Sequence, residues 1–150
     1  MAKVIKNGYG QIELTRVSFT KDGNIEAQCV ADEALENGLI VAVDKAAGTV
    51  KAVAKDAEAD AKMVYGVNYT TERIYNQFTP GRKNFRVEEG ECPRVGILKA
   101  GDVFTTNAYL VNEGATPAEG TIETYGAIKL LVAEITDTAD GQTAVKYQVL

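Results

Sequence analysis

Residues 36–50 read ENGLIVAVDKAAGTV, and this stretch predicts two β-strands joined by a tight turn. The apolar run Leu39–Val43 has the length of a buried strand, and Gly38 precedes it as a turn residue. The segment that follows, 44–48, is short, polar at its start and closed by a glycine, so it is expected to reverse the chain. Residues 49–53 are then expected to return as the second strand.

The same elements recur further along the chain. Gly38 and its strand are followed by Tyr65-Gly66-Val67, and Gly101-Asp102-Val103-Phe104 is followed by Tyr125-Gly126-Ala127-Ile128. In both places a glycine precedes an apolar strand and a Tyr-Gly pair precedes another. The recurrence indicates an all-β domain made of two similar halves, in which these glycines mark turns rather than a binding site.

Short apolar strands separated by Gly and Asp turns are expected along the rest of the chain. Residues 12–30 alternate in hydropathy around Asp22-Gly23 and predict a β-hairpin. Further strands are expected at residues 63–69, 95–98, 103–106, 108–111, 127–135 and 144–150. Residues 32–38 predict at most one helical turn, and residues 54–62 predict a short helix or a loop. The fold is therefore expected to be all-β, a small β-sandwich or barrel.

Residues 12–150 are expected to form a single β domain, because a chain of 150 residues suffices for one hydrophobic core. Residues 1–11 lack a periodic pattern and are interpreted as an N-terminal arm, which either clasps a neighbouring protein or frays in solvent. Residues 70–93 form a long irregular central segment and are interpreted as an inserted loop. A loop of this length within a compact domain is often functional.

The composition supplies few groups that carry out chemistry. The sequence has no His and no Trp, a single serine (Ser18) and two cysteines, Cys29 and Cys92. A nucleophilic triad would lack its usual base, and two cysteines fall short of the roughly four ligands of a structural zinc. Whether the cysteines pair is left open, with two reduced thiols favoured. We therefore expect no enzyme activity, no catalytic residue, no cofactor and no bound metal.

Charge and hydropathy limit the partners. The net charge of −5 argues against general nucleic-acid binding, which normally needs a basic surface. No apolar run approaches the roughly 18 residues of a membrane span, and the N-terminus does not resemble a signal peptide. The chain is therefore expected in a cytosol-like compartment, or in an assembly that forms there.

Positive charge is concentrated in the central segment. Between residues 69 and 87 four basic residues stand against one acidic residue, which gives a local charge of +3. The basic residues are Arg73, Arg82, Lys83 and Arg86, and the interleaved aromatic residues are Tyr69, Tyr75, Phe78 and Phe85. Arginine and aromatic side chains are enriched in protein interfaces, so the segment is interpreted as a partner-binding site. A loop packed on its own domain, or a platform for single-stranded nucleic acid, are the alternatives. In the arm, Lys3, Lys6 and Tyr9 are the expected contacts.

These segments resemble the tailed-phage head decoration (cement) proteins, the lambda head decoration protein-like β-tulip family. In the first half the resemblance is carried by residues 36–44, Gly48-Thr49-Val50 and Val64-Tyr65-Gly66-Val67. In the second half it is carried by residues 99–104 with Tyr109, by residues 125–128 and by residues 140–146. The resemblance covers roughly residues 35–150, and the central segment departs from the family pattern.

The resemblance implies a structural, non-enzymatic protein of the bacteriophage virion. Proteins of this family bind the outer surface of the head and clamp neighbouring major capsid proteins, so that the shell resists the pressure of packaged DNA. The implied partners are the major capsid protein and further copies of the chain itself, without nucleic acid or membrane. The implied location is the outer capsid surface, after assembly in the host cytoplasm. Two other functions remain open: a tail or head-fibre component, and a small ligand-binding β-barrel.

Overall fold

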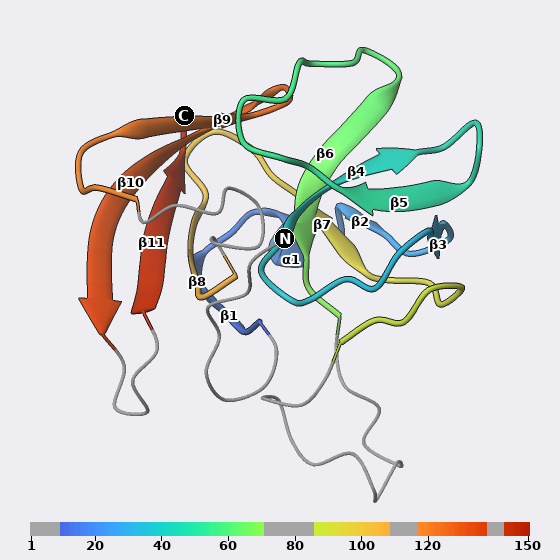
Figure 1. The fold of residues 1–150 in the computed structure, drawn as a ribbon, viewed down its shortest axis with the longest axis horizontal. Coiled ribbons are helices and arrows are strands. Elements are labelled where there is room, and N and C mark those ends of the chain that lie inside the picture. Colours follow the sequence, from blue (N-terminus) through green and yellow to red (C-terminus); the bar gives the residue numbers. More distant parts are fainter. Residues whose placement is uncertain (1–9, 71–85, 109–116, 138–142) are drawn as a thin grey trace, which may run out of the picture.

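The computed structural model describes residues 10–70, 86–108, 117–137 and 143–150. These residues form eleven strands and one short helix, and the strands make up two sheets (Figure 1). The all-β fold class expected from the sequence is thus confirmed. In this part of the chain, no helix combines the length and the apolar character that crossing a membrane demands.

Sheet A has five antiparallel strands and is built mainly from the second half of the chain. Its order is β1 (Ile12–Arg16), β8 (Val103–Thr106), β11 (Thr143–Val149), β10 (Ile128–Asp137) and β9 (Ile122–Tyr125). The two longest strands, β10 and β11, pair from Leu130 opposite Val149 to Asp137 opposite Thr143. Strand β9 falls in a stretch for which the sequence pattern predicts no strand.

Sheet B has six strands and contains the segment that predicted the fold. Its order is β2 (Ile25–Glu26), β7 (Val95–Ile97), β6 (Met63–Asn68), β4 (Ile40–Asp44), β5 (Thr49–Ala52) and β3 (Val30–Ala31). Strands β4 and β5 are joined by the expected turn, in which the Gly48 N–H donates to the Asp44 carbonyl at 2.7 Å. Only β3 and β5 run parallel in this sheet.

The main core lies between the two sheets. Strands β4 and β6 contribute Ile40, Ala42, Tyr65 and Val67, and sheet A contributes Phe104, Leu130, Val132, Val145 and Tyr147. The rings of Phe104 and Tyr147 lie 5.8 Å apart between centroids. In the last strand, β11, Val145, Tyr147 and Val149 are all buried, so alternate side chains of this strand point into the core.

A second apolar cluster covers the opposite face of sheet B. Leu39, Val41 and Val43 pack there with side chains from residues 29–35 and 87–95, which include the sheet's own strand β3 and the first residue of β7. Both faces of β4 are therefore removed from water. This explains why residues 39–43 read as a continuous apolar run rather than as an alternating one.

The prediction of a hairpin over residues 12–30 is wrong. Strand β1 belongs to sheet A and β2 to sheet B, and the short helix α1 (Phe19–Asp22) lies between them. The Asp22-Gly23 pair ends this helix instead of turning a hairpin, with Gly23 at φ +69°. The chain thus crosses from one sheet to the other at this point.

Two distant contacts hold the crossing in place. The Asp102 carboxylate accepts hydrogen bonds from the Ser18 N–H at 3.0 Å and from the Ser18 hydroxyl at 3.2 Å. Phe19 is fully buried, and its ring lies so close to Gly96 that a Cβ there would clash with it. Burying one aromatic ring stabilises a fold by about 1.5–3 kcal/mol, which outweighs the local preference for a hairpin.

The two Tyr-Gly pairs are not structurally equivalent. Gly66 lies inside β6, between Val41 and Ile97 of the neighbouring strands. Gly126 instead forms the turn from β9 to β10, with φ +63°. The recurring pattern therefore does not mark two similar halves of the fold.

Three local expectations are also resolved. Residues 32–38 contain no helical turn, and residues 54–62 form a loop rather than a helix. Ala108 lies outside any strand, and the rest of the strand expected at 108–111 lies outside the described residues. Of the central segment, residues 86–93 are irregular apart from one bridge between Val87 and Leu35, and residues 71–85 lie outside the described residues.

Candidate interaction site

One short loop lies where the predicted arm and central segment join the described domain. Residues 35–38, here called the anchor loop, lead into strand β4, and Leu35 and Glu36 are buried together with Gly38. Gly38 adopts φ +89°, and a Cβ on it would overlap the side chain of Thr106. The glycine at position 38 is thus required by backbone conformation and by close packing.

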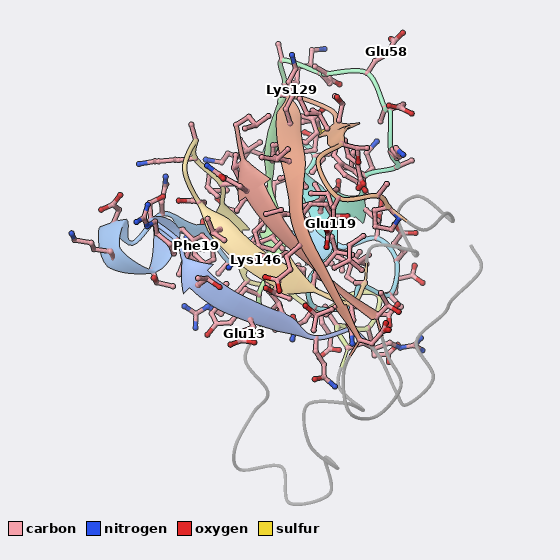
Figure 2. All side chains as sticks on the ribbon, turned by 90° about the vertical axis from the view of Figure 1, so that its left-hand side faces the viewer. Glu13, Phe19, Glu58, Glu119, Lys129 and Lys146 are labelled. Carbon is pink, nitrogen blue, oxygen red and sulfur yellow. The ribbon has the colours of Figure 1, made fainter. Side chains whose placement is uncertain are left out.

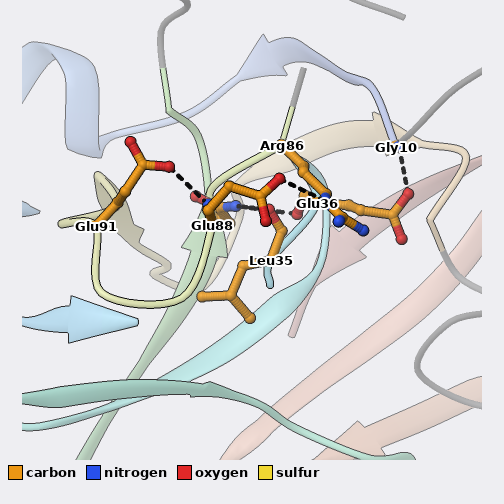
Figure 3. A network of polar contacts seen from close by, with 7 residues as sticks. Gly10, Leu35, Glu36, Arg86, Glu88 and Glu91 are labelled. Carbon is orange, nitrogen blue, oxygen red and sulfur yellow. Dashed lines mark hydrogen bonds and ion pairs between the residues drawn. The ribbon is translucent and has the colours of Figure 1, made fainter. Parts of the chain in front are cut away.

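The junction with the arm is fixed by Glu36. The Gly10 N–H donates to Glu36 Oε1 at 2.8 Å in a buried setting (Figure 3). A bond to a carboxylate is roughly twice as strong as one between neutral groups. A Cβ on Gly10 would lie 2.5 Å from the Asn37 carbonyl oxygen, so only glycine lets the chain pass this closely.

The start of the central segment is fixed by two asparagines. Asn37 binds the backbone of Thr70 twice: its Oδ1 accepts from the Thr70 N–H at 2.8 Å, and its Nδ2 donates to the Thr70 carbonyl at 3.0 Å. Asn68, fully buried at the end of β6, donates through Nδ2 to the Glu36 carbonyl at 3.0 Å. The Thr70 hydroxyl donates to Asn68 Oδ1 at 2.6 Å, which closes the network.

The other end of the central segment is fixed by Leu35. The backbones of Leu35 and Val87 exchange two hydrogen bonds, each 2.8 Å long. Next to this bridge, Arg86 Nε lies 2.8 Å from Glu88 Oε1, and the Glu88 N–H donates to Glu91 Oε1 at 2.8 Å (Figure 3). The chain on both sides of residues 71–85 is therefore held against the anchor loop.

A fourth junction lies at the same place. The Ala108 N–H donates to the Thr106 hydroxyl at 3.0 Å, and that hydroxyl donates to the Gly38 carbonyl at 3.2 Å. Ala108 is the last described residue before 117, and its Cβ lies against Gly10. The described ends next to the arm, the central segment and residues 109–116 thus meet around one buried loop.

Most of the predicted contact residues lie outside the described residues. These are Lys3, Lys6 and Tyr9 of the arm and Arg73, Tyr75, Phe78, Arg82, Lys83 and Phe85 of the central segment. Arg86 is described: its side chain is one-third exposed and pairs with the more exposed Glu88. An exposed pair of this kind contributes about 0–1 kcal/mol to stability.

The anchoring side chains of Glu36, Asn37 and Asn68 were not among the residues predicted from the sequence. Asn68 carries a weak signal, because it directly follows the apolar strand residues 63–67 and a buried amide must find hydrogen-bond partners. Glu36 carries none, because a glutamate beside Asn-Gly is usually a solvated turn residue. Its burial depends on a chain segment that lies 26 positions away.

The described residues hold no cluster of three or more His, Cys, Asp or Glu side chains that is arranged to bind a metal. Both cysteines are free thiols, Cys29 buried and Cys92 exposed. Burial raises the pKa of the Cys29 thiol, which makes it a weaker nucleophile at neutral pH.

No protein-family model matches this chain, and comparisons with curated proteins and with solved structures give no match either.

Proposed function

We propose that this chain is a phage capsid decoration protein, which binds the outer surface of the head and clamps neighbouring major capsid proteins. The observation that carries the proposal is the convergence at the anchor loop. Gly10, where the arm joins the described domain, and Thr70 and Val87, on either side of residues 71–85, are all hydrogen-bonded to this loop. The predicted partner-binding residues all belong to the two segments that leave the domain there.

Two binding segments that leave the domain at the same loop reach the same partner surface. When one segment binds, the other is held near its own site at a high effective concentration, which raises overall avidity by about 10²–10⁴. The anchor loop, from which both segments leave, is preorganised, because Glu36, Asn37 and Asn68 fix the backbone at each junction. A domain that repeats such a double contact over a lattice stabilises the lattice without any chemical step.

The uneven distribution of charge along the chain favours attachment to the capsid through one side of the domain. Residues 69–87 carry a net charge of +3, so that the rest of the chain carries −8 to give the net charge of −5. An acidic surface on the capsid would attract the basic segment and repel the remainder of the domain, which orients the chain as it approaches. Attachment is accordingly expected to weaken as the salt concentration rises.

Co-sedimentation with undecorated, expanded heads, made from the major capsid protein of the same genome, tests the proposal. The wild-type chain is expected to saturate the heads. Deletion of residues 1–9 retains Gly10 and its bond to Glu36, and it is expected to weaken binding by at least about tenfold through loss of avidity. The triple reversal R82E/K83E/R86E is expected to weaken binding to a similar extent.

A matched control separates docking from total charge. The reversal K21E/K51E/K62E changes the net charge by the same amount at exposed positions on α1, β5 and the 54–62 loop, and it should bind like the wild type. Full binding by both the deletion and the basic-segment variant would contradict the proposed contacts. A wild-type chain that ignores heads and forms tubes or fibres would instead be a tail or head-fibre component.

A further inference from the structure

The buried residue Asn68, at the end of β6, links the anchor loop to the start of the central segment. Its backbone N–H donates to the Leu39 carbonyl at 2.9 Å, and its carbonyl accepts from the Gly38 N–H at 2.9 Å. Its Nδ2 donates to the Glu36 carbonyl at 3.0 Å, and its Oδ1 accepts from the Thr70 hydroxyl at 2.6 Å. A buried network in which the polar groups are satisfied rigidifies the elements that it joins. The position of Thr70 therefore depends on that of the anchor loop.

Glu36 and Asn37 each face both junctions, one with the side chain and the other with the backbone carbonyl. The Gly10 N–H donates to the Glu36 carboxylate at 2.8 Å (Figure 3), whereas the Glu36 carbonyl accepts from Asn68. Asn37 is used in the reverse sense: its side chain binds Thr70 twice, and its carbonyl oxygen would lie 2.5 Å from a Cβ on Gly10. A movement of these two residues therefore disturbs the arm junction and the central-segment junction together.

Burial disfavours the opening of one junction at a time. Leu35 is fully buried and Glu36 is only 6 % exposed, so water does not take the place of a lost partner. A buried donor or acceptor that is left without its partner costs more free energy than the hydrogen bond itself contributes. Residues 35–38 are therefore expected to detach from Gly10 and Thr70 in one step, as a cooperative local opening.

We infer that the anchor loop couples the arm junction to the central-segment junction, so that fixing either one favours the other. The two states differ in defined contacts. In the closed state residues 36–37 bind both Gly10 and Thr70, and in the open state they bind neither. Anything that holds Gly10 in place selects the closed state and with it the docked position of Thr70. The coupling free energy is the same in the opposite direction.

The consequence for attachment rests on the proposed function. A capsid that binds the chain with Gly10 docked also prepares the start of the central segment for its own contact, so that the two contacts are cooperative beyond the effect of proximity. The coupling itself belongs to the free chain, and it is tested on the purified full-length protein without capsids. Coupled junctions in a chain that does not bind heads would refute the proposed function and leave the coupling intact.

Native-state hydrogen exchange, followed by NMR at individual amides, tests the coupling. Glu36→Ala removes the carboxylate that binds Gly10, whereas the Thr70 N–H is bound by Asn37. This variant is nevertheless expected to lower the protection of the Thr70 N–H by about tenfold or more, and by more than that of Leu130 in the main core. Thr70→Val is expected to lower the protection of the Gly10 N–H in the same way, although it leaves the acceptor on Glu36 in place.

Two control variants remove the same kinds of hydrogen bond elsewhere on the domain. Glu119, labelled beside the long strands of sheet A in Figure 2, accepts the Ile135 N–H at 3.1 Å. The Thr121 hydroxyl donates to the Ala118 carbonyl at 2.6 Å. Glu119→Ala and Thr121→Val should leave both junctions as well protected as in the wild type.

The variants are chosen so that the test has a result even if one of them does not fold. Glu36→Gln keeps an oxygen acceptor and should restore most of the protection of Thr70. If Glu36→Ala does not fold, Thr70→Val read at Gly10 decides alone. A Thr70 amide in Glu36→Ala, or a Gly10 amide in Thr70→Val, that exchanges as in the control variants would overturn the inference. A loss of protection no larger than that of Leu130 would overturn it as well, because the junctions would then open only with the whole domain.

Discussion

The ring of Tyr65 in β6 lies against Gly126, the glycine that turns β9 into β10, so that the Tyr-Gly pairs at 65–66 and 125–126 meet. A Cβ on Gly126 would overlap this ring, and Gly126 also adopts φ +63°. The Tyr65 hydroxyl accepts a hydrogen bond from the Asp60 N–H at 3.0 Å, which ties the 54–62 loop to the same place. One contact thus joins both sheets and a loop at one end of the core.

Gly126→Ala is expected to lower the free energy of unfolding by about 2–4 kcal/mol, from the left-handed backbone together with displacement of a packed ring. Urea unfolding measures the loss. Gly120→Ala is the matched control: Gly120 has φ +81°, but a Cβ added to it would meet nothing within 4 Å, so its cost should be about 1–2 kcal/mol. Equal losses in the two variants would show that the ring contact does not matter.

Glu36→Ala is expected to lower the free energy of unfolding by about 1–3 kcal/mol, because it leaves the buried Gly10 N–H without that acceptor. Cleavage by a protease within the first residues should also become faster, because the arm junction is released. Glu36→Gln keeps an oxygen acceptor and should recover much of the loss. Glu89→Ala, at an exposed glutamate, controls for removal of a carboxylate. A Glu36→Ala chain with the stability of the Glu89→Ala chain would refute the anchoring role.

Tyr147→Phe is expected to cost about 1–3 kcal/mol, because the buried Glu123 loses a hydroxyl donor 2.8 Å from its Oε1. The Tyr125 hydroxyl, 3.4 Å from the same oxygen, is a weaker partner, so Tyr125→Phe should cost less. Thermal unfolding of Tyr147→Phe, Glu123→Gln and the double variant forms a cycle. Strictly additive effects would mean that the two side chains are not coupled.

Thiol labelling with a disulfide reagent is expected to distinguish the two cysteines. Cys92 is exposed and should react quickly, whereas Cys29 is buried and its raised thiol pKa leaves less thiolate at any given pH. The native chain should therefore release one fast equivalent near pH 8, and the unfolded chain two. Cys92→Ala should abolish the fast phase. A fast phase that survives this substitution would place Cys29 at the surface.

Local signals predicted the parts of the fold that local contacts determine. The run Leu39–Val43 and the turn after it were predicted because burial on both faces and a closing Gly48 leave a direct mark on the sequence. The prediction of a hairpin over residues 12–30 was wrong because a distant contact, rather than a local one, determines this part of the fold. Its strands separate because Ser18 bonds to Asp102, a residue 84 positions away, and no short window of sequence contains that contact.

The candidate site likewise contains residues that can be recognised from the local sequence and residues whose role depends on distant contacts. The basic and aromatic residues of the central segment can be recognised from composition alone, and they remain predictions. The groups that bring the segment ends together cannot, because Asn37 meets Thr70 across 33 positions and Glu36 meets Gly10 across 26. Burial turns these ordinary turn residues into anchors, and burial is a property of the whole fold.

Attachment through the anchor-loop end of the domain is tested most directly by cryo-electron microscopy of decorated heads. We predict density for the domain on the outside of the shell, with the anchor loop, Gly10 and Thr70 facing the major capsid protein. The arm and the central segment should contact neighbouring capsid subunits. A map in which the domain binds the shell with the anchor loop turned to solvent, or in which saturating protein leaves the heads bare, would contradict the proposal.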